Sequence, residues 1–140
     1  MTVKEQLEKI KSNRNRLRLL QSRKNTLKAS ADLHSIDYAS DKVQTSGNGS
    51  SVENAVFKVL EREKQLDREI TAVILENDDL LSKIQSVDNG GIYSQVLYMK
   101  YAEDKELKEI AIELDYDYKY LCTMHNKALK LFGELYPMES

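Results

Sequence analysis

The sequence contains few of the residues that cross-link or interrupt a chain. Among its 140 residues there are one cysteine, one proline, five glycines and no tryptophan. A single thiol, Cys122, cannot form an internal disulfide or build a cysteine-rich zinc site, which favours a reducing, cytoplasmic setting. Because proline and glycine are the main helix breakers, their scarcity beside 41% hydrophobic and 31% charged residues predicts an all-α chain of long amphipathic helices.

Long apolar runs are also missing. The N-terminus reads MTVKEQLEKIK, and no stretch approaches the roughly 18 apolar residues of a membrane helix, so we expect neither a signal peptide nor a membrane span. Without a glycine-rich phosphate loop or a nucleophile elbow, an enzyme is not expected. Cys122 and His125 could share a metal ion, but His34 is the only other histidine, so we expect no metal site and no cofactor.

Charge is unevenly distributed along the chain. The net charge is -2, yet residues 1–30 carry nine Lys or Arg and two Glu, a local charge of +7. Residues 88–140 carry six bases and ten acids, a local charge of -4. The basic segment is either a solvated helix face or a surface for nucleic acid or an acidic partner protein. The candidate contacts on it are Arg14, Arg16, Arg18, Arg23 and Lys24.

Two long helices are predicted within an N-terminal part, residues 1–87. Apolar spacing indicates a helix over 3–29, a loop over 31–50 and a second helix over 51–87. The second helix follows a heptad series: Val52, Val56, Val59, Glu63, Leu66, Ile70, Val73, Asn77, Leu80, Ile84 and Val87. Such a stripe packs along a partner helix, which is either the first helix folded back as a hairpin or the same helix of a second subunit in a coiled coil. Asn77 would fix the register of that pair.

Four turn-forming residues, Asp88-Asn89-Gly90-Gly91, separate this part from a small domain over 92–136. Helices are predicted in this domain over 92–101, 105–114 and 117–136. The last two have the features of a helix-turn-helix, in which two short helices cross so closely that a small side chain, here Ala111, is needed. The expected shared core comprises Ile110, Leu114, Tyr116, Leu121 and Met124.

The turn between these helices contains one unusual residue. The fourth position after Ala111 is expected in the left-handed conformation, where glycine is most common, but this chain has Asp115. A non-glycine residue in that conformation costs about 1 kcal/mol. The turn is therefore weakened but still allowed, and Asp117 can cap the following helix.

Helical spacing divides the last helix into two faces. The inner face comprises Leu121, Met124, Ala128 and Leu131. The outward face comprises Tyr118, Lys119, Cys122, Thr123, Asn126, Lys127 and Lys130. No acid lies between Asp117 and Glu134, so we expect this face to bind double-stranded DNA, with lysines on phosphates and Thr123 and Asn126 on base edges.

The segment from Tyr98 to Phe132 resembles the promoter-reading fourth region of sigma-70 factors, with EIA at residues 109–111 and ALKL at residues 128–131. With DKVQTSG in the loop and the preceding basic helix, the chain resembles small phage regulators of late transcription of the ArpU and RinA kind. The resemblance implies a DNA-binding activator of phage late genes in the host bacterial cytoplasm, in contact with host RNA polymerase. It places five residues nearest the bases: Tyr118, Lys119, Cys122, Thr123 and Asn126.

Three lysines would neutralise about three phosphates. The logarithm of the DNA-binding constant then falls with the logarithm of the salt concentration with a slope of about -3, called the salt slope below, which is shallow. We therefore expect further affinity from homo-oligomerisation, from the basic first helix or from polymerase already on the promoter. The alternative is a helical protein-interaction factor that binds RNA polymerase or a host regulator without binding DNA.

Overall fold

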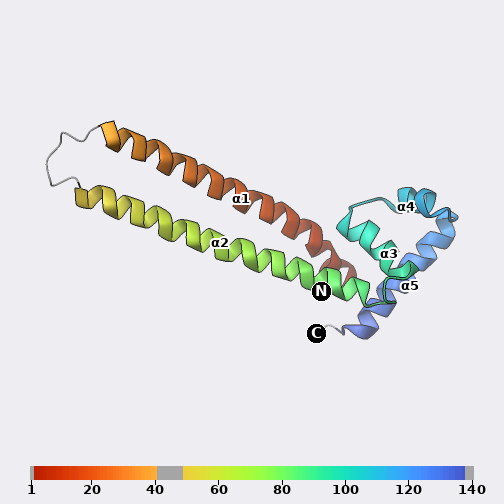
Figure 1. Cartoon of the computed structure of the whole chain (residues 1–140). Helices are drawn as coiled ribbons and strands as arrows, with labels where there is room; N and C mark the ends of the chain where they lie inside the picture. The colour runs from red at the N-terminus through yellow and green to blue at the C-terminus, as the bar shows by residue number, and fades with distance from the viewer. Residues whose placement is uncertain (1, 41–48, 138–140) are drawn as a thin grey trace. The chain divides into compact units, whose positions relative to one another are not determined.

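The computed structural model describes residues 2–40 and 49–137, with side chains at 2–31 and 53–137. All elements of these residues are helical, which confirms the predicted all-α class (Figure 1). In chain order they are α1 (Val3–Ser40), α2 (Gly49–Gln85), α3 (Ile92–Leu97), the π-helical turn η1 (Tyr98–Ala102), α4 (Leu107–Leu114) and α5 (Tyr118–Leu135).

The first helix is longer than predicted. It continues to Ser40 instead of ending at residue 29, so the predicted loop over 31–50 is wrong in its first half. The reason is that residues 30–40 contain neither proline nor glycine, and nothing in their sequence interrupts a helix. The rest of that loop, residues 41–48, lies outside the described residues. The second helix, α2, begins and ends close to the predicted bounds of 51–87.

The chain divides into two compact units, and each takes part of both long helices. The C-terminal unit comprises Met1–Asn15 and Ile74–Ser140, and the hairpin unit comprises Arg16–Val73. This division differs from the boundary predicted between residues 87 and 92. The cause is tertiary, because the N-terminal end of α1 and the C-terminal end of α2 pack in one core with the short helices.

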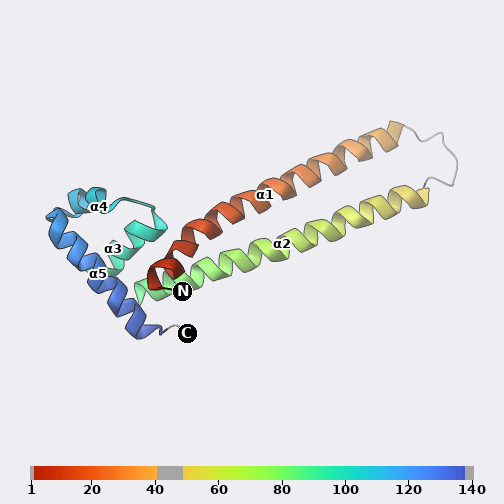
Figure 2. The same ribbon diagram turned by 180° about the vertical axis from the view of Figure 1, so that it is seen from behind.

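In the hairpin unit, α1 and α2 lie antiparallel and side by side (Figures 1 and 2). The buried core comprises Leu20, Leu66 and Val73, against which Leu17, Leu27 and Ile70 pack. Across the helices, the Lys24 ammonium lies 2.6 Å from an Asp67 carboxylate oxygen. A hydrogen bond from this lysine to Asp67 raises the pKa of Lys24. The predicted seam of α2 therefore packs against α1 of the same chain, as in the hairpin alternative.

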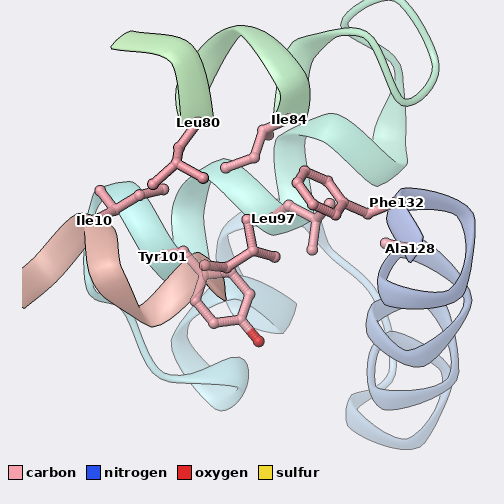
Figure 3. Packing of buried hydrophobic residues seen from close by; sticks show 8 residues of the cluster. Ile10, Leu80, Ile84, Leu97, Tyr101, Ala128 and Phe132 are labelled. Atoms are coloured by element: carbon pink, nitrogen blue, oxygen red, sulfur yellow. The ribbon is translucent and has the colours of Figure 1, made fainter. Parts of the chain in front are cut away.

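The main core of the C-terminal unit joins segments that are far apart in sequence. Figure 3 shows Ile10 of α1, Leu80 and Ile84 of α2, and Phe132 of α5 converging with side chains of the short helices. The buried members of this core are Leu7, Ile10, Leu80, Ile84, Leu97, Tyr101, Ala128 and Phe132. Because α5 contributes to this core, its orientation is fixed by the ends of both long helices.

Asn77 finds its partner within the same unit. The Asn13 amide nitrogen donates to the Asn77 side-chain oxygen at 3.0 Å, and the Asn77 amide nitrogen donates to the carbonyl of Ile10 at 3.2 Å. A partly buried amide pair on a largely apolar seam tolerates few shifts, because any other register would leave its donors and acceptors unpaired. The pair therefore fixes how α1 and α2 align in the C-terminal unit.

The turn between α2 and α3 is organised by Asp88. Its carboxylate accepts hydrogen bonds from the backbone N–H groups of Gly91 (2.9 Å), Tyr93 (2.9 Å) and Ser94 (3.1 Å), and from the Ser94 hydroxyl. Partial burial acts to raise the pKa of Asp88, but these hydrogen bonds outweigh it and hold the pKa below its usual value. The turn thereby satisfies the free donors at the start of α3.

Candidate nucleic-acid interface

The turn between α4 and α5 has the predicted conformation. Asp115 adopts φ 60 and ψ 45, which is left-handed, and it ends α4. The backbone N–H of Tyr116 donates to the carbonyl of Ala111 at 2.9 Å, closing the last turn of the helix. Asp117 follows in an extended conformation immediately before α5, although its side chain makes no capping hydrogen bond.

Below this turn, α4 and α5 share a small core with α3. Its buried residues are Val96, Ile110, Ala111 and Leu121, with Leu107, Leu114, Ile92 and Met99 packed around them. Ala111 is buried in the same cluster as Leu121, as expected for the small residue where two helices cross. The prediction was wrong for Tyr116, whose side chain is 39% exposed at the turn instead of lying in this core.

The inner side of α5 is more extensive than the sequence predicts. Leu121, Met124 and Ala128 are buried as expected, and Leu131 is half-buried. His125 and Phe132 are buried in addition. Sequence spacing alone offers little signal for His125, because histidine is common on both faces of helices, whereas Phe132 continues the apolar period of Met124 and Ala128.

His125 packs against Tyr101 of η1. The Tyr101 hydroxyl oxygen and His125 Nε2 lie 2.9 Å apart in the interior, and the two rings are stacked. Burial, with a further contribution from Lys100 and Lys4, lowers the pKa of His125 to about 4. Burial and the charge of Glu8 raise the pKa of Tyr101 to about 12. Both rings are therefore neutral at pH 7 and hold α5 against η1.

The outward face of α5 is accessible. Of the seven predicted contacts, Tyr118, Lys119, Thr123, Asn126, Lys127 and Lys130 are exposed, and Cys122 is half-buried. The Thr123 hydroxyl donates to the carbonyl of Lys119 at 3.2 Å, which leaves its oxygen lone pairs available. Within the described residues, the ion pairs involve lysines outside α5, so the three lysines of this face are not neutralised by a contacting carboxylate.

Acidic side chains near the turn are partly neutralised. The Lys105 ammonium lies 2.9 Å from a carboxylate oxygen of Glu113 and 3.1 Å from one of Glu103. Hydrogen bonds to Glu113 and Glu103 raise the pKa of Lys105. The helix before α5 therefore presents less free negative charge than its sequence suggests.

Large apolar and aromatic side chains lie at the same turn, and of these Ile112, Tyr116 and Tyr120 were not among the predicted contacts. Ile112 is 80% exposed, and the rings of Tyr116 and Tyr120 lie 5.6 Å apart on the surface. The Lys108 ammonium lies 5.9 Å from the centre of the Tyr118 ring. Exposed aromatic rings next to lysines suit contacts to thymine methyl groups or to sugars as well as contacts to protein.

Two of the five predicted cations of the first helix have partners within their own units. The Arg14 guanidinium donates to the carbonyl of Ala102 within the C-terminal unit, and Lys24 pairs with Asp67 in the hairpin unit. Arg16, Arg18 and Arg23 are exposed. Two of the five residues thus have roles in holding helices together.

In the part of the chain that the structure describes, no three His, Cys, Asp or Glu side chains gather as metal ligands. No helix in that part is long and apolar enough to cross a membrane. Comparisons with family models, with curated proteins and with solved structures found no match.

Proposed function

We propose that the protein is a sequence-specific DNA-binding transcription regulator that reads double-stranded DNA with α5. The observation that carries this proposal is the division of α5 into one side that is buried in two cores and one that is exposed and positive. The left-handed turn at Asp115 and the buried Ala111 support a helix-turn-helix. Lys119, Lys127 and Lys130 would hold phosphates.

Base reading would fall to the polar residues between the lysines. Asn126 can form two hydrogen bonds to an adenine edge, and Thr123 can contact a base or a thymine methyl group. The described α5 contains no arginine, the commonest partner of guanine, so the site is suited to A·T pairs. Tyr118 and the half-buried Cys122 would lie at the edge of this reading surface.

The biological setting rests on the resemblance of residues 98–132 to sigma-70 region four. It supports an activator of phage late genes that works in the host bacterial cytoplasm, as a homo-oligomer or in contact with host RNA polymerase. The small number of lysines on α5 supports oligomerisation or polymerase contact, because a surface with a salt slope of about -3 needs another source of affinity.

Binding to DNA fragments from the vicinity of the gene tests the proposal. The wild-type chain and Lys119→Ala/Lys127→Ala would be compared by fluorescence anisotropy at about 50 to 200 mM salt. Loss of two phosphate contacts should make the salt slope shallower by about 2. Lys28→Ala/Lys64→Ala, which removes two exposed lysines from the hairpin unit, is the matched control and should bind as the wild type does.

A second candidate function is favoured by a groove of about 500 Å³ in the C-terminal unit. Its lining includes the apolar residues Leu81, Ile84 and Met99 and the acids Asp78 and Glu103. Such a groove fits a basic amphipathic segment of a protein partner, for example of RNA polymerase or of a host regulator. If the wild-type chain retains no DNA at low salt but captures polymerase, and Met99→Glu removes that capture, protein binding replaces DNA binding as the function.

A further inference from the structure

Two hollows on the surface of the hairpin unit share one arginine, Arg62. One, of about 360 Å³, is lined by residues of both α1 and α2: Arg23 and Arg62, together with Ser22, Thr26 and Ser30. The other, of about 430 Å³, lies along α2 and includes Lys58, Arg62 and Arg68. The four cations Arg23, Lys58, Arg62 and Arg68 are called the basic strip below.

Helical geometry explains why the three cations of α2 share a surface. Lys58 and Arg62 are four residues apart, and Gln65 and Arg68 follow at steps of three, so the side chains lie along one face. That face flanks the apolar seam, where Leu66 packs against α1. On α1, Ser22, Thr26 and Ser30 repeat every four residues and line the opposite side of the first hollow.

The charge of the basic strip is largely uncompensated. Within the described residues, the ion pairs involve other cations, and Asp67 is already paired with Lys24. Arg62 donates to the side-chain oxygen of Gln65 at 2.8 Å, so its guanidinium is positioned by a neutral group. Glu61 is the one carboxylate among the lining residues of the two hollows, against four cations.

The spacing of these cations suits a polyanion. Ten residues separate Lys58 from Arg68, which corresponds to about 15 Å along the helix axis. One DNA strand carries a phosphate about every 3.4 Å of axis, so the strip can face about four phosphates. Guanidinium groups and hydroxyls are the common protein partners of phosphate oxygens.

From these observations we infer that the basic strip of the hairpin unit binds the phosphate backbone of DNA without regard to sequence. This surface is separate from α5 and is an addition to the proposed function. It would supply affinity, whereas α5 would supply specificity. Four neutralised phosphates would contribute about -3.6 to the salt slope, which is more than the three lysines of α5 contribute.

The test uses the full-length protein and a duplex of random sequence, so that base reading does not contribute. Arg62→Gln/Arg68→Gln would be compared with Lys28→Gln/Lys64→Gln, which removes the same charge from exposed positions of the same unit outside the strip. The strip variant should show a salt slope shallower by about 2, measured by anisotropy at about 50 to 200 mM salt, and the control should keep the wild-type slope. Glutamine keeps helix propensity, and circular dichroism would show that both variants are folded.

Repeating the comparison in Lys119→Ala/Lys127→Ala separates the two surfaces. If this background still binds the random duplex and the strip substitutions abolish binding, the inference stands, even if no specific fragment is ever recognised. If the salt slope becomes shallower by the same amount in the strip variant and in the control variant, the effect is one of net charge and the inference is refuted. It is equally refuted if Arg62→Gln/Arg68→Gln binds DNA as the wild type does but loses binding to vesicles containing phosphatidylserine or to a poly-glutamate peptide.

Discussion

Lowering the pH from 7 to 5 should destabilise the C-terminal unit by protonating His125. The imidazole is 6% exposed and lies between α5 and η1, where its Nε2 is 2.9 Å from the Tyr101 hydroxyl. Burial lowers the pKa of His125 to about 4, whereas a histidine of an unfolded chain titrates near pH 6.5. The unfolded state therefore binds the proton more tightly than the folded state, and acid favours unfolding.

The magnitude follows from the two pKa values. Because the pKa of His125 is depressed in the folded state, the contribution of the neutral imidazole to the free energy of unfolding is fully present above about pH 6.5. This contribution is lost as the pH falls toward 4. The linkage relation gives a loss of about 1.8 kcal/mol between pH 7 and pH 5. Screening by solvent at the edge of the core reduces this loss, so we expect the free energy of unfolding to fall by about 1 to 1.5 kcal/mol.

Tyrosine fluorescence during urea unfolding is the appropriate assay. The sequence has no tryptophan, and seven of its eight tyrosines follow residue 90, so the signal reports mainly on the C-terminal unit. His125→Gln should remove most of the pH dependence, since the amide can still bond to Tyr101 but does not titrate in this range. If the wild type and His125→Gln lose the same free energy of unfolding between pH 7 and pH 5, the assignment of the acid effect to His125 is wrong.

Two further predictions concern the effect of single substitutions on the free energy of unfolding. Asp115→Gly should raise the free energy of unfolding by about 1 kcal/mol, because glycine adopts φ 60 without strain, and a lower thermal midpoint would contradict this. Asn77→Leu should lower the free energy of unfolding by about 1 to 3 kcal/mol, because it leaves the buried amide of Asn13 without its partner. In urea unfolding, Asn13→Leu/Asn77→Leu should recover most of that loss, and a double variant as unstable as the single one would refute the pairing argument.

The α4–α5 segment could be predicted largely from the sequence because its geometry is local. The left-handed turn at Asp115, the buried Ala111 and the exposed face of α5 all follow from spacings of a few residues. A strong contrast between apolar and polar positions fixes which side of α5 faces inward. Tyr116 is the exception, since a turn residue next to the core can point either way and no periodicity decides it.

Contacts between distant segments could not be predicted in this way. The sequence does not decide the partner of the α2 seam, because a heptad pattern is the same for a hairpin and for two subunits. Phe132 is buried against Ile10, Leu80 and Ile84, which come from the ends of two long helices far from it in sequence. For the same reason, the sequence did not reveal that these helix ends belong to the C-terminal unit.

The charge of a sequence segment proved a poor guide to the charge of a surface. Residues 1–30 carry +7, yet Arg14 and Lys24 are directed to partners within their own units. Three of the four cations in the basic strip come instead from α2, which has more acids than bases. A helix turns about 100° per residue, so cations spaced by three and four residues gather on one face. If both surfaces bind DNA, substitutions in the strip should weaken all fragments alike, and substitutions in α5 should change which fragment is preferred.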